Sequence, residues 1–290
     1  MTLMKTKFSI KRLALAIQWN VFNYGKEYIN GTIGLGLGMS IYMCVHMHNH
    51  ATRNALIAQN SGLSAEDYLL ADAKPFLASV LLILVCCMAA SVLTNVQDKL
   101  KRETFLMLPC SNMEKFVSRI MVSSVAPVIM FIAGLVIADV AQALFNLFFT
   151  PHVHISLLWT AAKDFINTIS DGLISGIVVD NSPMPEITAW AFLIFMHSFY
   201  TLCGSIFRKK PIAFAWLITF GALTTFGLIV VYLAKNGYLD DFNLEMTNED
   251  ICRLAILCTT ASLALAALNY WLSYKIFTRI QLIGNKWFNL

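Results

Sequence analysis

Six long apolar segments constrain the fold of this chain more than any other feature. As a helix, each can cross the roughly 30 Å hydrocarbon core of a bilayer, which takes about 20 residues. They cover about 30–48, 75–96, Phe116 to beyond Ala138, 187–207, 212–234 and 252–274. Charged residues make up only 13% of the chain, against about 25% in soluble domains. The sequence therefore predicts an all-α, polytopic membrane protein with six transmembrane helices in a single transmembrane domain, 1–290.

Lysine and arginine are distributed unevenly over the segments that connect these spans. They gather before the first span, between the second and third, between the fourth and fifth, and after the sixth. These residues are Lys5, Lys7, Lys11, Arg12 and Lys26; Lys99, Lys101, Arg102, Lys115 and Arg119; Arg208, Lys209 and Lys210; Lys275, Arg279 and Lys286. The positive-inside rule places such connections in the cytoplasm. We therefore expect a multi-pass protein of the plasma (inner) membrane with both termini cytoplasmic.

Two further stretches have the pattern of amphipathic helices. In residues 7–24 a broad apolar face lies beside cations, which is typical of a helix on an anionic membrane surface. Residues 1–29 are therefore predicted to be a cytoplasmic interface helix that leads uncleaved into the first span. In residues 150–186, apolar residues recur at helical spacing opposite Lys163 and Asp164. This extracytoplasmic segment either lies on the outer interface or is an ordinary packed loop helix.

The connection between the second and third spans, residues 97–119, is charged at both ends and apolar in its middle. Pro109 breaks any helix that enters from the N-terminal side. Ser111 or Asn112 can cap a new helix that carries Glu114 in its first turn. A compact knob with an apolar centre suits docking to a soluble partner, and a solvated helical extension would have the same pattern. Both interpretations remain open from the residues alone.

Thr104, the leucines that follow it and the run Leu108-Pro109-x-Ser111-x-x-Glu114-Lys115 resemble the membrane subunits of ABC transporters of the type-2 exporter superfamily. The resemblance implies a homodimeric permease whose loop 97–115 forms a coupling helix against a separate ATPase. The partner-coupling residues that we expect in this loop are Lys101, Arg102, Glu103, Leu106, Leu108, Pro109, Ser111, Glu114 and Lys115. The chain departs from the family in 235–251, which is short and acidic where those permeases often carry apolar re-entrant helices.

The sequence has no GxxxxGK[ST] phosphate-binding loop and no GxSxG or HExxH motif. We therefore expect no enzyme activity and no bound cofactor in this chain, with ATP and Mg on the partner ATPase. The expected partners are that ATPase subunit, a second copy of the chain and the lipid bilayer. No basic run of the nucleic-acid type occurs. The alternative is a membrane-embedded accessory or assembly protein that docks a cytosolic partner without transport.

His46, His48 and His50 follow the first span. On a helix His46 and His50 share a face, so that both could bind one metal ion, and His152 and His154 lie on the same predicted side. Because no cysteine or carboxylate joins them at a defined spacing, we expect these histidines to mark the membrane–water boundary. The alternative is a zinc or copper transporter or sensor.

Three other features have structural interpretations. Asp139 is the one carboxylate in a strongly apolar context, and we expect it at the polar interface rather than within the bilayer. We expect His197 to form a hydrogen bond to a neighbouring helix. Gly34 and Gly38 are four residues apart, which predicts a packing seam within the chain or between two protomers.

Overall fold

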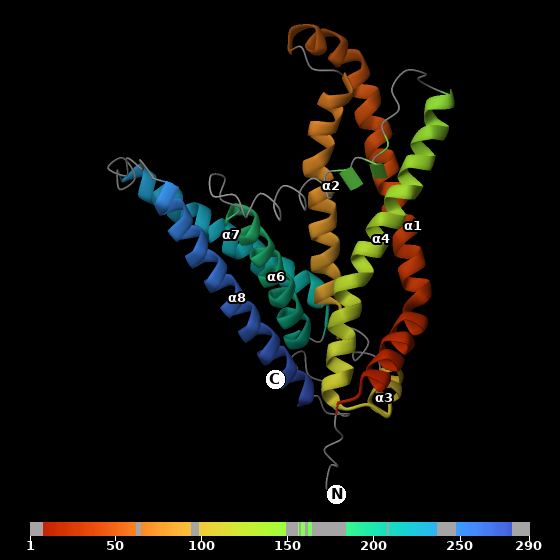
Figure 1. The fold of residues 1–290 in the computed structure, drawn as a ribbon, viewed down its shortest axis with the longest axis vertical. Helices are drawn as coiled ribbons and strands as arrows, with labels where there is room; N and C mark the ends of the chain where they lie inside the picture. Colours follow the sequence, from red (N-terminus) through yellow and green to blue (C-terminus); the bar gives the residue numbers. More distant parts are fainter. Residues whose placement is uncertain are drawn as a thin grey trace, which may run out of the picture. The chain divides into compact units, whose positions relative to one another are not determined.

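The computed structural model describes residues 8–61, 65–93, 99–148, 156, 158, 159, 162, 163, 184–207, 209–236 and 248–279. The main elements are α1 (Ile10–Ser61), α2 (Ala65–Ala90), α3 (Lys99–Leu106), α4 (Asn112–Phe148), α6 (Met184–Ile206), α7 (Pro211–Lys235) and α8 (Asn248–Thr278) (Figure 1). These residues contain no strand. The predicted all-α fold is confirmed for this part of the chain.

Five helices in the described residues are long and apolar enough to cross a membrane. They are Ile10–Val45, Asn112–Phe145, Ile187–Ile206, Pro211–Lys235 and Cys252–Thr278. These helices coincide with the first and with the third to sixth predicted spans and indicate a membrane-embedded protein. The second predicted span corresponds to the shorter apolar helix Pro75–Ala90 within α2. A membrane crossing by the second predicted span, and with it the total of six, therefore stays a prediction.

Exposed aromatic residues near helix ends agree with a bilayer environment. Trp216 near the start of α7 and Tyr232 near its end are both exposed. At 1.5 Å per residue they lie roughly 24 Å apart along the helix, close to the thickness of a hydrocarbon core. Trp190 near the start of α6 and Trp271 near the end of α8 are also exposed. Tryptophan and tyrosine are enriched at membrane–water interfaces, because their rings have both an apolar and a polar part.

α1 differs from the predicted combination of interface helix and separate span. It runs through 52 residues without a break, which is about 78 Å at 1.5 Å per residue. A bilayer core takes less than half of that length. From Ile10 onward, the segment predicted as an interface helix forms the first turns of this long helix. No separate N-terminal helix occurs among residues 8–61.

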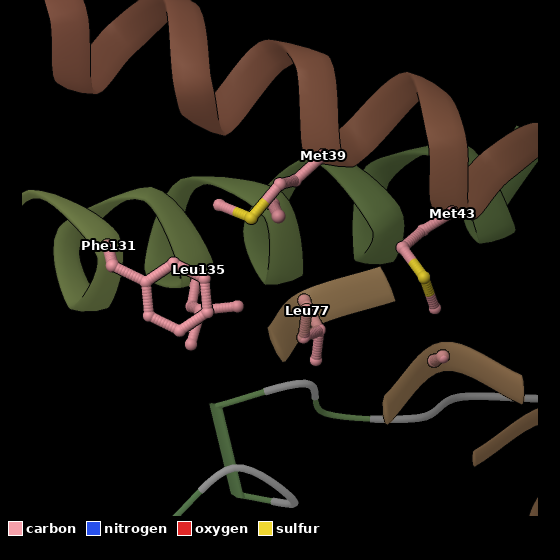
Figure 2. Packing of buried hydrophobic residues seen from close by; sticks show 7 residues of the cluster. Met39, Met43, Leu77, Phe131 and Leu135 are labelled. Atoms are coloured by element: carbon pink, nitrogen blue, oxygen red, sulfur yellow. The ribbon is translucent and has the colours of Figure 1, made fainter. Parts of the chain in front are cut away.

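Contacts divide the chain into two compact units. The first unit contains residues 1–13, 86–120 and 179–290, and the second contains 14–85 and 121–178. In the second unit, Met39 and Met43 of α1 pack with Leu77 of α2 and with Phe131 and Leu135 of α4 (Figure 2). Ala73 and Ala138 complete this cluster of buried apolar side chains. The second unit is thus held by an apolar core to which three helices contribute.

A glycine brings α1 and α4 close together beside this core, but not the pair that the sequence singled out. A Cβ at Gly36 would lie 2.7 Å from the Cβ of Ile137, whereas Gly34 and Gly38 have nothing within 4 Å. Gly36 therefore permits the close approach within the chain. At Gly34 and Gly38 the predicted seam therefore has no counterpart among the residues that the structure describes.

In the first unit, α6 packs against α8 with polar side chains between them. His197 Nδ1 lies 2.7 Å from the Tyr270 hydroxyl, and the Asn269 amide donates to Ser198 Oγ at 3.2 Å. The predicted interhelical hydrogen bond of His197 is confirmed. Such bonds satisfy polar groups that lipid cannot.

Candidate docking site

The α3–α4 turn belongs to the first unit and follows directly from the local sequence. α3 ends at Leu106, and the chain then reverses, with the Cys110 amide donating to Leu108 O at 2.7 Å. Pro109 lies in this turn, where it cannot continue a helix. α4 begins at Asn112. The predicted sequence of helix, break and new helix is confirmed.

Ser111 and Glu114 form a capping box at the start of α4. The Glu114 amide donates to Ser111 Oγ at 3.2 Å, and the Ser111 amide donates to Glu114 Oε2 at 2.8 Å. Each side chain thus satisfies a backbone N–H that the first helical turn leaves without an intrahelical acceptor. Of the two caps that the sequence allowed, Ser111 is therefore the one that binds.

The second carboxylate oxygen of Glu114 binds the start of α1. Glu114 Oε1 accepts from the Ser9 amide at 2.6 Å and from Arg12 Nη2 at 3.0 Å and Nε at 3.3 Å. The Glu114 side chain has an exposed fraction of 0%, and that of Arg12 is 32%. Charge-assisted hydrogen bonds of this kind compensate the cost of burying a carboxylate. We call Ser9, Arg12, Ser111 and Glu114 the Glu114 clasp.

The next cations on α4 hold α3. The buried Lys115 ammonium donates to Leu106 O at 2.7 Å, at the carbonyl end of α3. A cation is favoured there because the last carbonyls of a helix carry partial negative charge. One turn further along α4, the Arg119 guanidinium lies 4.5 Å from the ring centroid of Phe105. Phe105 is fully buried and also packs against Phe277 of α8. α3 is therefore fixed to α4 and α8.

With Phe105 turned inward, α3 presents an outer face of exposed residues. Leu100 is 72% exposed and Met107 is 82% exposed, and Lys101 and Thr104 are exposed as well. Residues 100, 104 and 107 follow the helical spacing that places side chains on one face. We call Leu100, Lys101 and Thr104, together with Met107 directly after the last residue of the helix, the outer face of α3.

The predicted partner-coupling residues differ in their exposure in the structure. Lys101 and Pro109 are exposed, and Glu103, Leu106, Leu108 and Ser111 are half-buried. Glu114 and Lys115 are buried, so they position the turn rather than present a surface. The side chain of Arg102 lies outside the described residues. The set of residues predicted from the sequence does not include Leu100 and Met107, the most exposed apolar side chains of this region, although their spacing opposite Phe105 was a usable signal.

Cys110 lies between the Glu114 clasp and the turn. Its thiol donates to the Arg12 carbonyl at 3.6 Å. Burial raises the pKa of the Cys110 thiol, and the charge of Glu114 raises this pKa further, whereas Lys115 and Arg12 act in the opposite direction. The thiol is therefore protonated near neutral pH and reacts slowly, because the thiolate is the nucleophile.

The other candidate residues lie apart from this turn in the sequence. His46, His48 and His50 belong to α1, but their side chains, like His152 and His154, fall outside the described residues. Among the residues that the structure describes, no three histidine, cysteine or acidic side chains could hold a metal ion together. Asp139 Oδ2 accepts from Ser156 Oγ at 2.7 Å and from the Leu158 amide at 3.1 Å. Asp139 therefore anchors the segment that places Leu158 on the apolar core.

Comparisons of the chain with protein-family models, with curated proteins and with solved structures found no match. The resemblance to type-2 ABC exporter permeases therefore rests on residues 104–115 and on the predicted spans.

Proposed function

We propose that this chain is the membrane-spanning permease subunit of an ATP-driven ABC exporter. The outer face of α3 would contact a separate ATPase subunit in the cytoplasm, and two copies of the chain would form the substrate pathway. The observation that carries the proposal is that Leu100 and Met107 are exposed, while Phe105, Lys115 and Arg119 on the other side of α3 are buried. Contiguous exposed apolar surface rimmed by polar residues is typical of interaction sites, and the proposal is that a partner covers these two side chains together.

The contacts between α3 and the start of α4 support a role in transmitting movement from a partner to a membrane-spanning helix. Lys115 and Arg119 lie at the start of α4, which is one of the helices long enough to cross a membrane. Both contact α3 directly, through Leu106 O and the Phe105 ring. Packed side chains transmit displacement because protein interiors are dense and resist compression. A partner that shifts α3 would therefore shift the start of α4, which is the coupling that an exporter driven by a separate ATPase needs.

The remaining parts of the proposal complete this arrangement. The chain would cross the plasma (inner) membrane six times with both ends in the cytoplasm, and the first turns of α1 would lie near the inner membrane surface. ATP and Mg would bind to the partner, because the chain carries no phosphate-binding loop. The alternative function is an accessory or assembly protein that uses the same outer face to hold a cytosolic partner without transport.

The test uses the tagged full-length chain in its native membrane and in liposomes. We expect an ABC ATPase to co-purify with the wild type and to hydrolyse ATP faster in its presence. Met107→Glu, which places a charge at the most exposed apolar residue of the outer face, should weaken binding at least about tenfold, as for loss of a buried apolar anchor. Met107→Leu keeps size and polarity and serves as the matched control.

Three outcomes separate the possibilities. If no ATPase co-purifies with the wild type, the exporter proposal fails. If an ATPase binds but its rate of ATP hydrolysis is the same without the chain, with the wild type and with the charge reversal Lys101→Glu, the accessory function is favoured. The accessory function is also favoured if the protein that binds is not an ATPase. If Met107→Glu and Met107→Leu bind equally well, the outer face of α3 is not the docking surface.

A further inference from the structure

One carboxylate joins the starts of two helices that are far apart in the sequence. Glu114 Oε2 accepts from the Ser111 amide at the start of α4, while Oε1 accepts from the Ser9 amide at the start of α1. Helix starts carry partial positive charge, so that each favours an anion in this position. Arg12 adds a full positive charge to the α1 side. The first turn of α1 is therefore bound to the α3–α4 turn through a single buried group.

The same short stretch of chain also holds α3. Glu114 binds the start of α1, and its neighbour Lys115 binds the last carbonyl of α3 at Leu106. The turn makes a second contact with α1, because the Cys110 thiol donates to the carbonyl of Arg12. A displacement of α1 from Glu114 would leave a buried carboxylate without its cation, which is strongly unfavourable. The start of α4 would then have to rearrange, and Lys115 would move with it.

We propose that the first turn of α1, Ser9–Leu13, is a regulatory element that controls the outer face of α3 through the Glu114 clasp. With the clasp closed, α3 is held in the geometry that the soluble partner recognises. With the clasp open, the α3–α4 turn loosens and affinity for the partner falls. This inference rests on the proposed function, since the partner is the ATPase proposed above. Linkage requires the converse as well, so that partner binding to α3 closes the clasp.

The first experiment measures clasp opening in the absence of the partner. A variant that keeps Cys110 and replaces the other cysteines is reconstituted in nanodiscs and labelled with a maleimide at pH 7. Arg12→Gln should raise the labelling rate about tenfold, as expected for loss of a charge-assisted hydrogen bond to a buried group. Lys11→Gln, at the exposed neighbouring position, should label at the wild-type rate.

The direction of this effect separates opening from simple electrostatics. Arg12 lowers the pKa of Cys110, so that its removal alone would raise this pKa and slow the labelling. Faster labelling of Arg12→Gln therefore reports exposure of the thiol. A rate at or below that of the wild type would overturn the inference. Arg12→Lys keeps the charge and should restore slow labelling, which guards against a variant that is merely misfolded.

The second experiment measures the linkage to the partner. We expect Arg12→Gln to weaken binding of the ATPase about tenfold, although Arg12 lies outside the outer face of α3, and Lys11→Gln to leave it unchanged. Hydrogen exchange at amides 9–13 should slow when the ATPase binds to the wild type, but not when it binds to Glu114→Gln. If the ATPase binds to the wild type and to Arg12→Gln equally well, this inference is wrong and the proposed function stands. If no ATPase binds to the wild type at all, both fail.

Discussion

The α3–α4 turn in the first unit and the apolar core of the second unit are held together by different interactions. At the turn, buried Glu114 and Lys115 bind backbone groups and Arg12 at defined distances. In the second unit, Met39, Met43 and their neighbours make non-directional contacts. Charge-assisted hydrogen bonds require a defined distance and angle between donor and acceptor, whereas apolar cores accept substitutions that conserve volume.

This difference indicates where the molecule needs one defined geometry. A buried charge is an expensive way to gain stability, because desolvation offsets most of the attraction. Its advantage is that only one arrangement satisfies every group. The turn that carries the outer face of α3 has this kind of construction, and the core of α1, α2 and α4 does not. The predictions that follow use the free energy of unfolding of the purified protein, measured by titration with SDS in micelles.

The largest effect is expected at Phe105, the apolar side chain beneath the turn. Phe105→Ala should reduce the free energy of unfolding by about 3–5 kcal/mol, because a fully buried ring is replaced by a cavity. The variant also removes the ring that faces Arg119. Phe226→Ala, on the exposed surface of α7, is the control and should change little. Equal losses in the two variants would show that α3 is not packed as described.

The second prediction concerns the crossing of α6 and α2 in the first unit. A Cβ at Gly204 would collide with the backbone carbonyl of Ala90, which cannot move without displacing the end of α2. Gly204→Ala should therefore cost about 1–3 kcal/mol. Gly221 on α7 has nothing within 4 Å, so that Gly221→Ala should be neutral or stabilise by up to about 1 kcal/mol. Stabilisation by both substitutions would contradict the close crossing.

The residues at these sites also show what sequence could and could not predict. Apolar runs and the Ser111–Glu114 capping box are local patterns, so that the helices long enough to span and the start of α4 were predictable. The bonds from Ser9 and Arg12 to Glu114 were not, because they join segments about a hundred residues apart. The inward position of Glu114 and Lys115 depends on those partners. The outward position of Leu100 and Met107 depends on the packing of Phe105.

A third prediction tests the glycines of α1 in the second unit. Gly36→Ala should cost about 1–2 kcal/mol, because a Cβ there would lie 2.7 Å from the Cβ of Ile137, which is fixed to the backbone, and 3.2 Å from Gly134 O. The cost should be somewhat less than for Gly204→Ala, where the nearest atom is a backbone carbonyl that is closer still. Gly34→Ala and Gly38→Ala should, like Gly221→Ala, leave the stability of the single chain unchanged or raise it by up to about 1 kcal/mol. If either one weakens self-association of the protein in a crosslinking assay, the seam predicted from the sequence lies between two protomers.

The smallest effect is expected at the polar contacts between α6 and α8. His197→Phe or Tyr270→Phe removes an interhelical hydrogen bond of 2.7 Å. Such bonds contribute on average only about 0.6 kcal/mol in membrane proteins, since the separated helices also find partners for their polar groups. A double-mutant cycle isolates this term from packing changes, because the double variant loses the bond only once. A coupling well above about 1.7 kcal/mol would place the His197–Tyr270 contact with the buried charges of the turn, as an interaction that fixes geometry rather than one that merely satisfies a polar side chain in lipid.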